Sequence, residues 1–261
     1  MGSWIFVAIA CNLIGGLQAQ TNYCVTSYCS NNRVNIGCNP PGFPGGAGCN
    51  GLNPVVITLN STIQSLILSE HNSRRSQLAL GQLQSFEPAT RMATVTWDTE
   101  LANQAGNNAR NCTYQHDSCR NTAVYAWAGQ NLALTQFYGT TYTVAQLVTS
   151  GINSWWSEFN VTTQAQLKSY PSGYTGPAIG HFTQMASDQT ARIGCAMQHW
   201  KQGPWLTYYF VCNYAVTNVI GRPTYKPGPV GSACSTGLNP SLPGLCSVSE
   251  SINPVPNPRI V

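Results

Sequence analysis

The sequence contains few charged residues. Asp, Glu, Lys and Arg make up only 8% of its 261 residues, whereas they make up about 25% of a usual soluble domain. The 12 basic residues are scattered along the chain, so the net charge of +4 does not indicate a nucleic-acid partner. Gly, Asn, Ser, Thr and Gln must therefore supply most of the polar surface.

Long hydrophobic runs are absent as well. No segment reaches the roughly 20 apolar residues that a transmembrane helix needs. The mostly apolar stretch 4–14 is shorter, and small residues that end at Ala19 follow it. This pattern is typical of a secretory signal peptide over residues 1–19. We therefore expect a secreted, extracellular, monomeric protein without a transmembrane segment.

Sequence signatures of common enzyme and metal sites are also missing. The chain has no Cys-x-x-Cys pair of a zinc ribbon, no His-Glu-x-x-His of a zinc protease and no Gly-x-Ser-x-Gly of a serine hydrolase. Ser187, which follows His181 by six positions, is therefore interpreted as a loop or strand residue and not as a nucleophile.

Cysteine, in contrast, is abundant, with 11 residues. Cleavage after Ala19 removes Cys11 and leaves ten, an even number that predicts five disulfides in an oxidising compartment. Spacing alone does not select among the about 945 ways of pairing them.

Periodicity predicts three helices, over residues 61–80, 98–112 and 143–159, and a hairpin of strands over residues 193–200 and 206–214. His71 falls on the core-facing side of the first helix, whereas His199 ends a strand and is expected to be exposed. Trp155 and Trp156 are expected to form core and cavity wall. A Cys/Gly/Pro-rich extension (20–57) precedes this main domain (58–222), and a Pro-rich tail (223–261) follows it.

Several short motifs occur together in the main domain. Gly-His-Phe-Thr-Gln at 180–184 precedes Gly-Cys at 194–195 and Cys-Asn-Tyr at 212–214; the others are Cys-Thr-Tyr-Gln-His-Asp-Ser-Cys-Arg at 112–120, Gly-Gln-Asn-Leu-Ala at 129–133, Trp-Trp-Ser-Glu at 155–158 and Gly-Arg-Pro-Thr-Tyr at 221–225. With the cysteines of the extension, they resemble the CAP superfamily of cysteine-rich secretory, antigen 5 and pathogenesis-related class 1 proteins. The resemblance covers roughly residues 22–228 and is closest in type to insect venom allergen 5, in its dipteran form.

The resemblance implies a fold and a set of disulfides. The fold is α+β, an α-β-α sandwich in which a small antiparallel sheet lies between helical layers and is stapled by disulfides. The antigen 5 pattern implies four pairs and leaves the last two cysteines to each other: Cys24–Cys38, Cys29–Cys119, Cys49–Cys112, Cys195–Cys212 and Cys234–Cys246.

The resemblance also implies a polar cavity. The family's two histidines and two acidic residues fall on His116, His181, Glu158 and Gln130, so an amide replaces one carboxylate. His116 and His181 are candidate ligands for Zn²⁺, with Glu158 and Gln130 in support. Three interpretations stay open: a metal-capable cavity without turnover, a structural hydrogen-bonded network, and a catalytic site. No cofactor is required by the first two.

By resemblance, we expect a non-enzymatic salivary, venom or body-fluid protein that binds a small hydrophobic, lipid-like ligand or a host or tissue protein, and that is a potential allergen. One alternative is a metal-dependent hydrolase using His116, His181 and Glu158. Another is a protease inhibitor or channel-directed toxin, although only two cysteines follow Cys212, too few for the usual cysteine-rich module.

Three Asn-x-Ser/Thr sequons predict a glycoprotein. Asn60 and Asn160 lie at predicted helix ends, where a glycan has room. Asn111 is a weaker site, because a disulfide at Cys112 would crowd it.

Overall fold

Two long strands, β4 (Arg192–Gln202) and β5 (Trp205–Tyr214), form an antiparallel hairpin at the centre of the computed structural model. The structure describes residues 21–253, so the predicted signal peptide lies outside the described residues. The hairpin predicted from the sequence is therefore present, and both strands extend slightly beyond their predicted bounds.

Three further strands complete the sheet. β3 (Gly129–Phe137) pairs antiparallel with β5, and β1 (Val55–Ile57) pairs antiparallel with β4. The two-residue β2 (Thr96–Trp97) pairs parallel with β4. The strand order is β1-β4-β5-β3, and the predominantly antiparallel sheet confirms the predicted sheet type.

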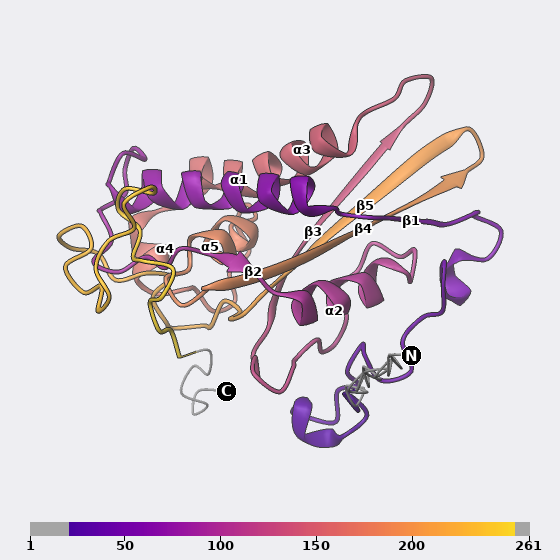
Figure 1. Ribbon diagram of the computed structural model, residues 1–261, viewed down its shortest axis with the longest axis horizontal. Coiled ribbons are helices and arrows are strands. Elements are labelled where there is room, and N and C mark those ends of the chain that lie inside the picture. Colours follow the sequence, from indigo (N-terminus) through magenta and orange to yellow (C-terminus); the bar gives the residue numbers. More distant parts are fainter. Residues whose placement is uncertain (1–20, 254–261) are drawn as a thin grey trace, which may run out of the picture.

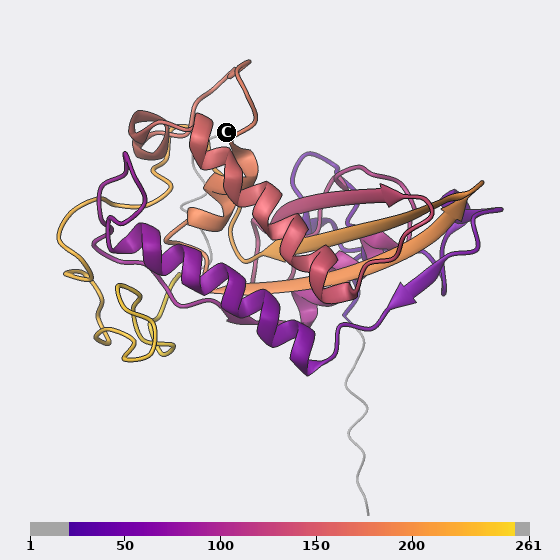
Figure 2. The same ribbon diagram turned by 90° about the horizontal axis from the view of Figure 1, so that it is seen from above.

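Helices cover both faces of the sheet (Figure 1). α2 (Thr99–Ala109) packs its alanines against one face, on Tyr209 and Val211. α1 (Ser61–Ala79), α3 (Val144–Trp156) and α5 (Gly180–Ala186) cover the other face, where Phe210 and Cys212 point into the main core. Figure 2 shows α1 and α3 crossing this face together. The α-β-α sandwich is therefore confirmed.

The helix boundaries follow local capping. The side chain of Asn60 accepts a hydrogen bond from the Ile63 N–H at the start of α1, and Asp98 does the same for Leu101 in α2. Thr143 and Gln146 form a capping box at the start of α3. The predicted helix 143–159 is wrong at its end, because the chain tightens into the 3₁₀ helix η3 (Ser157–Val161) after Trp156.

Five disulfides staple the described part of the chain. The pairs are Cys24–Cys38, Cys29–Cys119, Cys49–Cys112, Cys195–Cys212 and Cys234–Cys246, the same pairs that the resemblance implies. Two of them join the extension, whose described part holds the 3₁₀ turns η1 (Thr26–Tyr28) and η2 (Ala47–Cys49) and ends in the short strand β1, to the segment after α2. A segment with little core of its own is thereby fixed to the sandwich.

The tail after β5 is packed into the main domain. Tyr225 and Leu245 are fully buried in the main core, and the carboxylate of Glu250 accepts hydrogen bonds from Ser235, Thr236 and Arg91. Burial alone would raise the pKa of Glu250, but these hydrogen bonds lower it to about 2. The tail therefore shares the core of the sandwich.

Candidate two-histidine site

His181 lies at the start of α5 and is held by Glu158 of η3. Glu158 Oε1 accepts a hydrogen bond from His181 Nδ1 at 2.6 Å, and Oε2 accepts from the backbone N–H groups of His181 and Phe182 at 2.8 and 3.0 Å. Both carboxylate oxygens are therefore used in fixing the first turn of α5. With its Nδ1 proton directed at Glu158, the neutral imidazole keeps its lone pair on Nε2.

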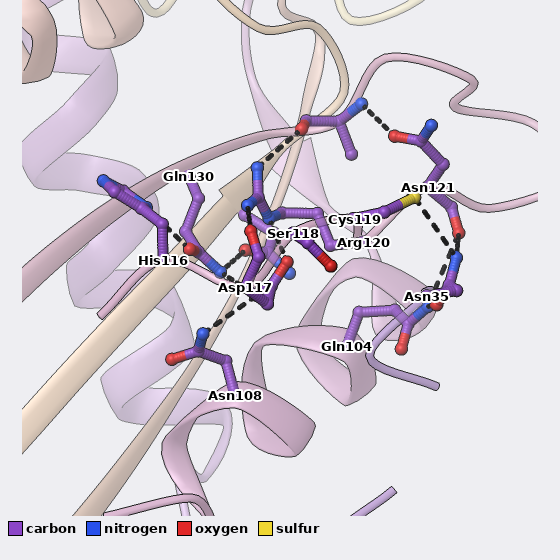
Figure 3. Close-up of polar contacts among 12 residues, drawn as sticks. Asn35, Gln104, Asn108, His116, Asp117, Ser118, Cys119, Arg120, Asn121 and Gln130 are labelled. Atoms are coloured by element: carbon purple, nitrogen blue, oxygen red, sulfur yellow. Dashed lines mark hydrogen bonds and ion pairs between the residues drawn. The ribbon is translucent and has the colours of Figure 1, made fainter. Parts of the chain in front are cut away.

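His116, in the loop after α2, is held by Gln130 of β3. Its Nδ1 lies 2.8 Å from Gln130 Oε1, and Gln130 Nε2 donates to Asp117 Oδ2 at 2.8 Å and to Asn213 Oδ1 at 3.0 Å. Figure 3 shows this chain of contacts. Because an amide oxygen can only accept, Nδ1 of His116 must carry the proton. His116 thus has the same tautomer as His181.

The electrostatics of the site favour a neutral His116. Burial lowers the pKa of His116, and the nearby Arg120 and His181 lower it further, whereas the hydrogen bond that His116 donates to Gln130 and the charge of Asp117 oppose the shift. A neutral imidazole is the form that can bind a metal ion.

Trp155 and Trp156 lie in the main core, as expected from the sequence. Trp155 stacks on His181 with ring centroids 6.3 Å apart and on Phe210 with centroids 5.2 Å apart. Its indole N–H donates to the Leu132 carbonyl at 2.9 Å. The tryptophan is 1% exposed, so it forms a rigid backing for His181.

A network of buried hydrogen bonds connects the backbone of His181 to α1. Asn131 donates to the backbone oxygen of His181 and to the Tyr214 hydroxyl, and Tyr214 contacts Nε2 of His71 at 2.9 Å. Burial lowers the pKa of His71 to about 4. The core position predicted for His71 is confirmed, and its role there is to connect α1 to β5.

Two other residues considered in the sequence lie away from this site. His199 was expected to be exposed at a strand end, which is wrong: β4 continues to Gln202, and His199 is half-buried opposite Tyr208. Ser187 is buried just after α5, and its backbone carbonyl accepts from the Arg75 guanidinium. It has no hydrogen bond to either site histidine.

Sequence reasoning missed the groups that fix the two histidines. Asp117, Asn213 and Asn131 each hold a part of the site, and the buried Arg75 donates to carbonyls at the end of α5 and in the segment after it. The position of Asp117, next to His116 and three residues before Arg120, was the available signal.

The candidate metal donors at this site are the two imidazoles, without a third protein ligand among the described residues. In residues 21–253, no group of three or more His, Cys, Asp or Glu side chains is arranged to hold a metal ion. His116 Nε2 and His181 Nε2 have no hydrogen-bond partner in that part of the chain. Glu158, the candidate third ligand, is already used through both oxygens.

The three sequons differ in the freedom of their side chains. Asn60 is exposed and uses only its oxygen, as the cap of α1, which leaves its nitrogen available for a glycan. Asn160 is exposed but donates to the Ser157 carbonyl. Asn111 is half-buried beside the Cys49–Cys112 disulfide. Glycosylation stays a prediction, strongest at Asn60.

Comparison with known proteins places this architecture in a family. The model of the cysteine-rich secretory protein family, CAP, matches residues 68–214. Venom allergen-1 of Aedes aegypti is 42% identical over 240 residues, which are 92% of this chain and 92% of that protein. Antigen 5 like allergen Cul n 1 of Culicoides nubeculosus is 35% identical over 186 residues, 68% of this chain and 83% of that protein.

A solved structure agrees with these sequence matches. The crystal structure of NaASP2 with Zn²⁺ superposes with a TM-score of 0.58 at 25% identity, covering 72% of this chain and 96% of that chain. No helix within residues 21–253 is long and apolar enough to cross a membrane. The relatives and the disulfides support a secreted protein. The chain belongs to the CAP family of cysteine-rich secretory proteins and is an antigen 5-like member of it.

Proposed function

We propose that this chain is a secreted, non-enzymatic binding protein whose two-histidine site holds a divalent metal ion without turning over a substrate. One observation carries the proposal: both carboxylates at the site are fully engaged. Glu158 accepts from His181 and Phe182, and Asp117 accepts from Arg120, Asn108 and Gln130. Every oxygen of these two carboxylates already accepts at least one hydrogen bond, which disfavours both as a general base or a metal ligand.

Zn²⁺ is the metal that the donor set fits first. Two neutral imidazoles suit zinc, and the Zn²⁺ in the structure of NaASP2 supports this choice. His116 and His181 would hold the ion, and the ion would offer open coordination positions to a donor group of a ligand or partner. In this chain the two histidines bind, while Gln130 and Glu158 orient them.

Zinc titration of the purified protein tests the proposal. We expect one zinc per chain by native mass spectrometry, and loss of binding in His116→Ala and in His181→Ala. His199→Ala is the matched control, because it removes a half-buried histidine outside the site. Zinc-dependent turnover of peptide or ester libraries that disappears in His181→Ala would overturn the non-enzymatic proposal in favour of a hydrolase.

A lipid-like ligand is a second candidate function, favoured by a groove between α1 and α3. The groove has a volume of about 570 Å³, within the roughly 300–1,000 Å³ of small-molecule sites. Leu83, Trp156 and Phe159 provide apolar lining, whereas the other lining residues are polar: Ser73, Arg74, Gln77, Asn153 and Ser157. This combination suits an amphipathic molecule with an apolar body.

Filling the groove tests this second function. Gln77→Trp places a large ring over the groove from an exposed helix position, and Ser69→Trp adds the same ring to an exposed position of α1 outside it. We expect Gln77→Trp, and not Ser69→Trp, to abolish binding of a fluorescent fatty acid. Equal binding by wild type and both variants would refute the assignment to this groove.

A protein partner is the remaining proposal if neither zinc nor lipid binds. The names of the relatives support a role as a venom component and a potential allergen; a salivary or other body-fluid component stays part of the proposal. A channel-directed or protease-inhibiting module receives less support, because Cys234 and Cys246, the two cysteines after β5, pair with each other in the tail.

A further inference from the structure

The carboxylate of Asp117 is buried beside His116 and accepts hydrogen bonds on both oxygens. Its side chain is only 4% exposed. Oδ1 accepts from Arg120 Nε at 2.7 Å, and Oδ2 accepts from Asn108 Nδ2 at 2.9 Å and Gln130 Nε2 at 2.8 Å (Figure 3). A carboxylate in this position presents acceptors only.

This carboxylate fixes the direction of the Gln130 amide. The amide nitrogen donates to Asp117 and to Asn213, and Asn213 in turn donates to the Leu101 carbonyl at 3.3 Å. If the amide were reversed, its oxygen would face the oxygens of Asp117 and Asn213, which is unfavourable. The Gln130 oxygen therefore faces Nδ1 of His116, and that nitrogen must donate.

We propose that Asp117 is the positioning residue of His116: through the Gln130 amide it holds the imidazole in the tautomer that carries its lone pair on Nε2. The consequence for zinc rests on the proposed function, whereas the tautomer does not. Arg120 keeps Asp117 in place, because its guanidinium also donates to the backbone oxygens of Asp117 and Ala128.

The same geometry explains why an amide stands at position 130. A glutamate there would bring a second carboxylate oxygen about as close to Asp117 Oδ2 as the Gln130 nitrogen now is, at 2.8 Å. Two carboxylates at this distance repel each other. Gln130 and Asp117 thus form a matched pair, and the amide preserves the histidine geometry that a carboxylate provides at His181.

The test reads the tautomer of His116 directly by long-range ¹H–¹⁵N correlation spectra, at a mildly alkaline pH where the imidazole is neutral. In wild type we expect the proton on Nδ1. In Asp117→Asn, the new side-chain oxygen must accept the hydrogen bond from Arg120. The NH₂ group of the same side chain then points toward Gln130. We expect this to reverse the Gln130 amide and to move the His116 proton toward Nε2.

A second substitution gives a rescue that a merely structural role would not show. In Asp117→Asn with Gln130→Glu, the carboxylate at position 130 can only accept, so the proton should return to Nδ1. Asp188→Asn, at a buried carboxylate outside the site, is the control and should leave the spectrum unchanged. Zinc affinity should fall on the order of 10- to 100-fold in Asp117→Asn and recover in the double variant.

Each outcome decides one claim. Any one of three results would overturn the inference. They are a His116 proton on Nε2 in wild type, an unchanged tautomer in Asp117→Asn, and a double variant in which the proton does not return to Nδ1. If Asp117→Asn does not fold, Gln130→Leu replaces it, because removal of the amide should also release the Nδ1 proton. Absence of zinc binding in wild type would sink the proposed metal function alone, since the tautomer is read without metal.

Discussion

The two histidines of the site reach the same tautomer by different means. At His181, the carboxylate of Glu158 accepts a hydrogen bond directly from Nδ1. The same carboxylate also accepts hydrogen bonds from two backbone N–H groups of α5. At His116, the neutral amide of Gln130 accepts the hydrogen bond from Nδ1. The carboxylate of Asp117 in turn accepts a hydrogen bond from this amide and fixes its direction. Each Nδ1 therefore has a fixed acceptor, which is charged at His181 and neutral at His116.

The two ends also differ in how they are attached. The His181 end is built from α5 and η3, which pack on the main core, whereas the His116 end lies in a loop that two disulfides fix to the extension. Removal of a disulfide should therefore weaken one end and leave the other in place.

Loss of the Cys29–Cys119 disulfide should have the largest effect. Cys29→Ser with Cys119→Ser opens a crosslink with a sequence separation of 90. Because Cys49–Cys112 still closes the inner part of this loop, the released loop holds about 30 residues, which corresponds to about 3–4 kcal/mol in the chain-entropy model. Urea unfolding measures the loss, and NMR should show His116 signals that broaden while those of His181 stay sharp. The control removes Cys234–Cys246, whose separation is 12, and should cost about 3 kcal/mol without broadening His116. Equal broadening of the His116 and His181 signals would show that the two ends of the site are not attached independently.

Glu158→Ala should be the next most damaging change. It leaves His181 Nδ1 and two backbone N–H groups of α5 without an acceptor, so we expect a loss of about 3 kcal/mol in the free energy of unfolding. Glu87→Ala is the control, because the Glu87–Lys168 ion pair is half-exposed and should contribute less than about 1 kcal/mol. Similar losses in both variants would show that Glu158 is not an anchor of α5.

The pH dependence of stability separates His116 from the buried His71. Burial lowers the pKa of His71 to about 4, so the unfolded chain takes up this proton first as pH falls. Stability should fall by about 3 kcal/mol as pH drops from about 6.5 to about 4. Urea unfolding measured across this pH range gives the free energy of unfolding at each pH. Its decrease on acidification should become smaller in His71→Gln and should change less in His116→Gln. An unchanged slope in His71→Gln would refute the assignment.

Gln130→Ala should cost the least, about 1–2 kcal/mol, because it removes neutral hydrogen bonds and one charge-assisted bond. Gln136→Ala, at an exposed position of the same strand with a single side-chain hydrogen bond to Thr207, should change stability by less than about 1 kcal/mol. The loss at position 130 should stay below that of Glu158→Ala. The opposite order would make the amide end the stronger of the two anchors.

The sequence predicts the regular parts of this molecule better than its fixed side chains. Periodicity indicates α1, α2 and the β4–β5 hairpin, because their apolar residues repeat on one face. It misses β3, most of whose residues are buried without clear alternation, and β1 and β2, which exist only by pairing with β4. The resemblance places both histidines, but not Asp117, Asn131 or Asn213, whose roles depend on contacts between distant segments.

The burial of Tyr225 and Leu245 bears on where the folding unit ends. The family match stops at residue 214, yet these two side chains are fully enclosed by the main core and Glu250 is tied to Arg91. A chain that ended after β5 would expose apolar side chains of α1 and of the segment before β2. We expect such a chain to be prone to aggregation and proteolysis. We therefore expect the smallest piece that can be produced as an intact domain to reach past β5 to Glu250.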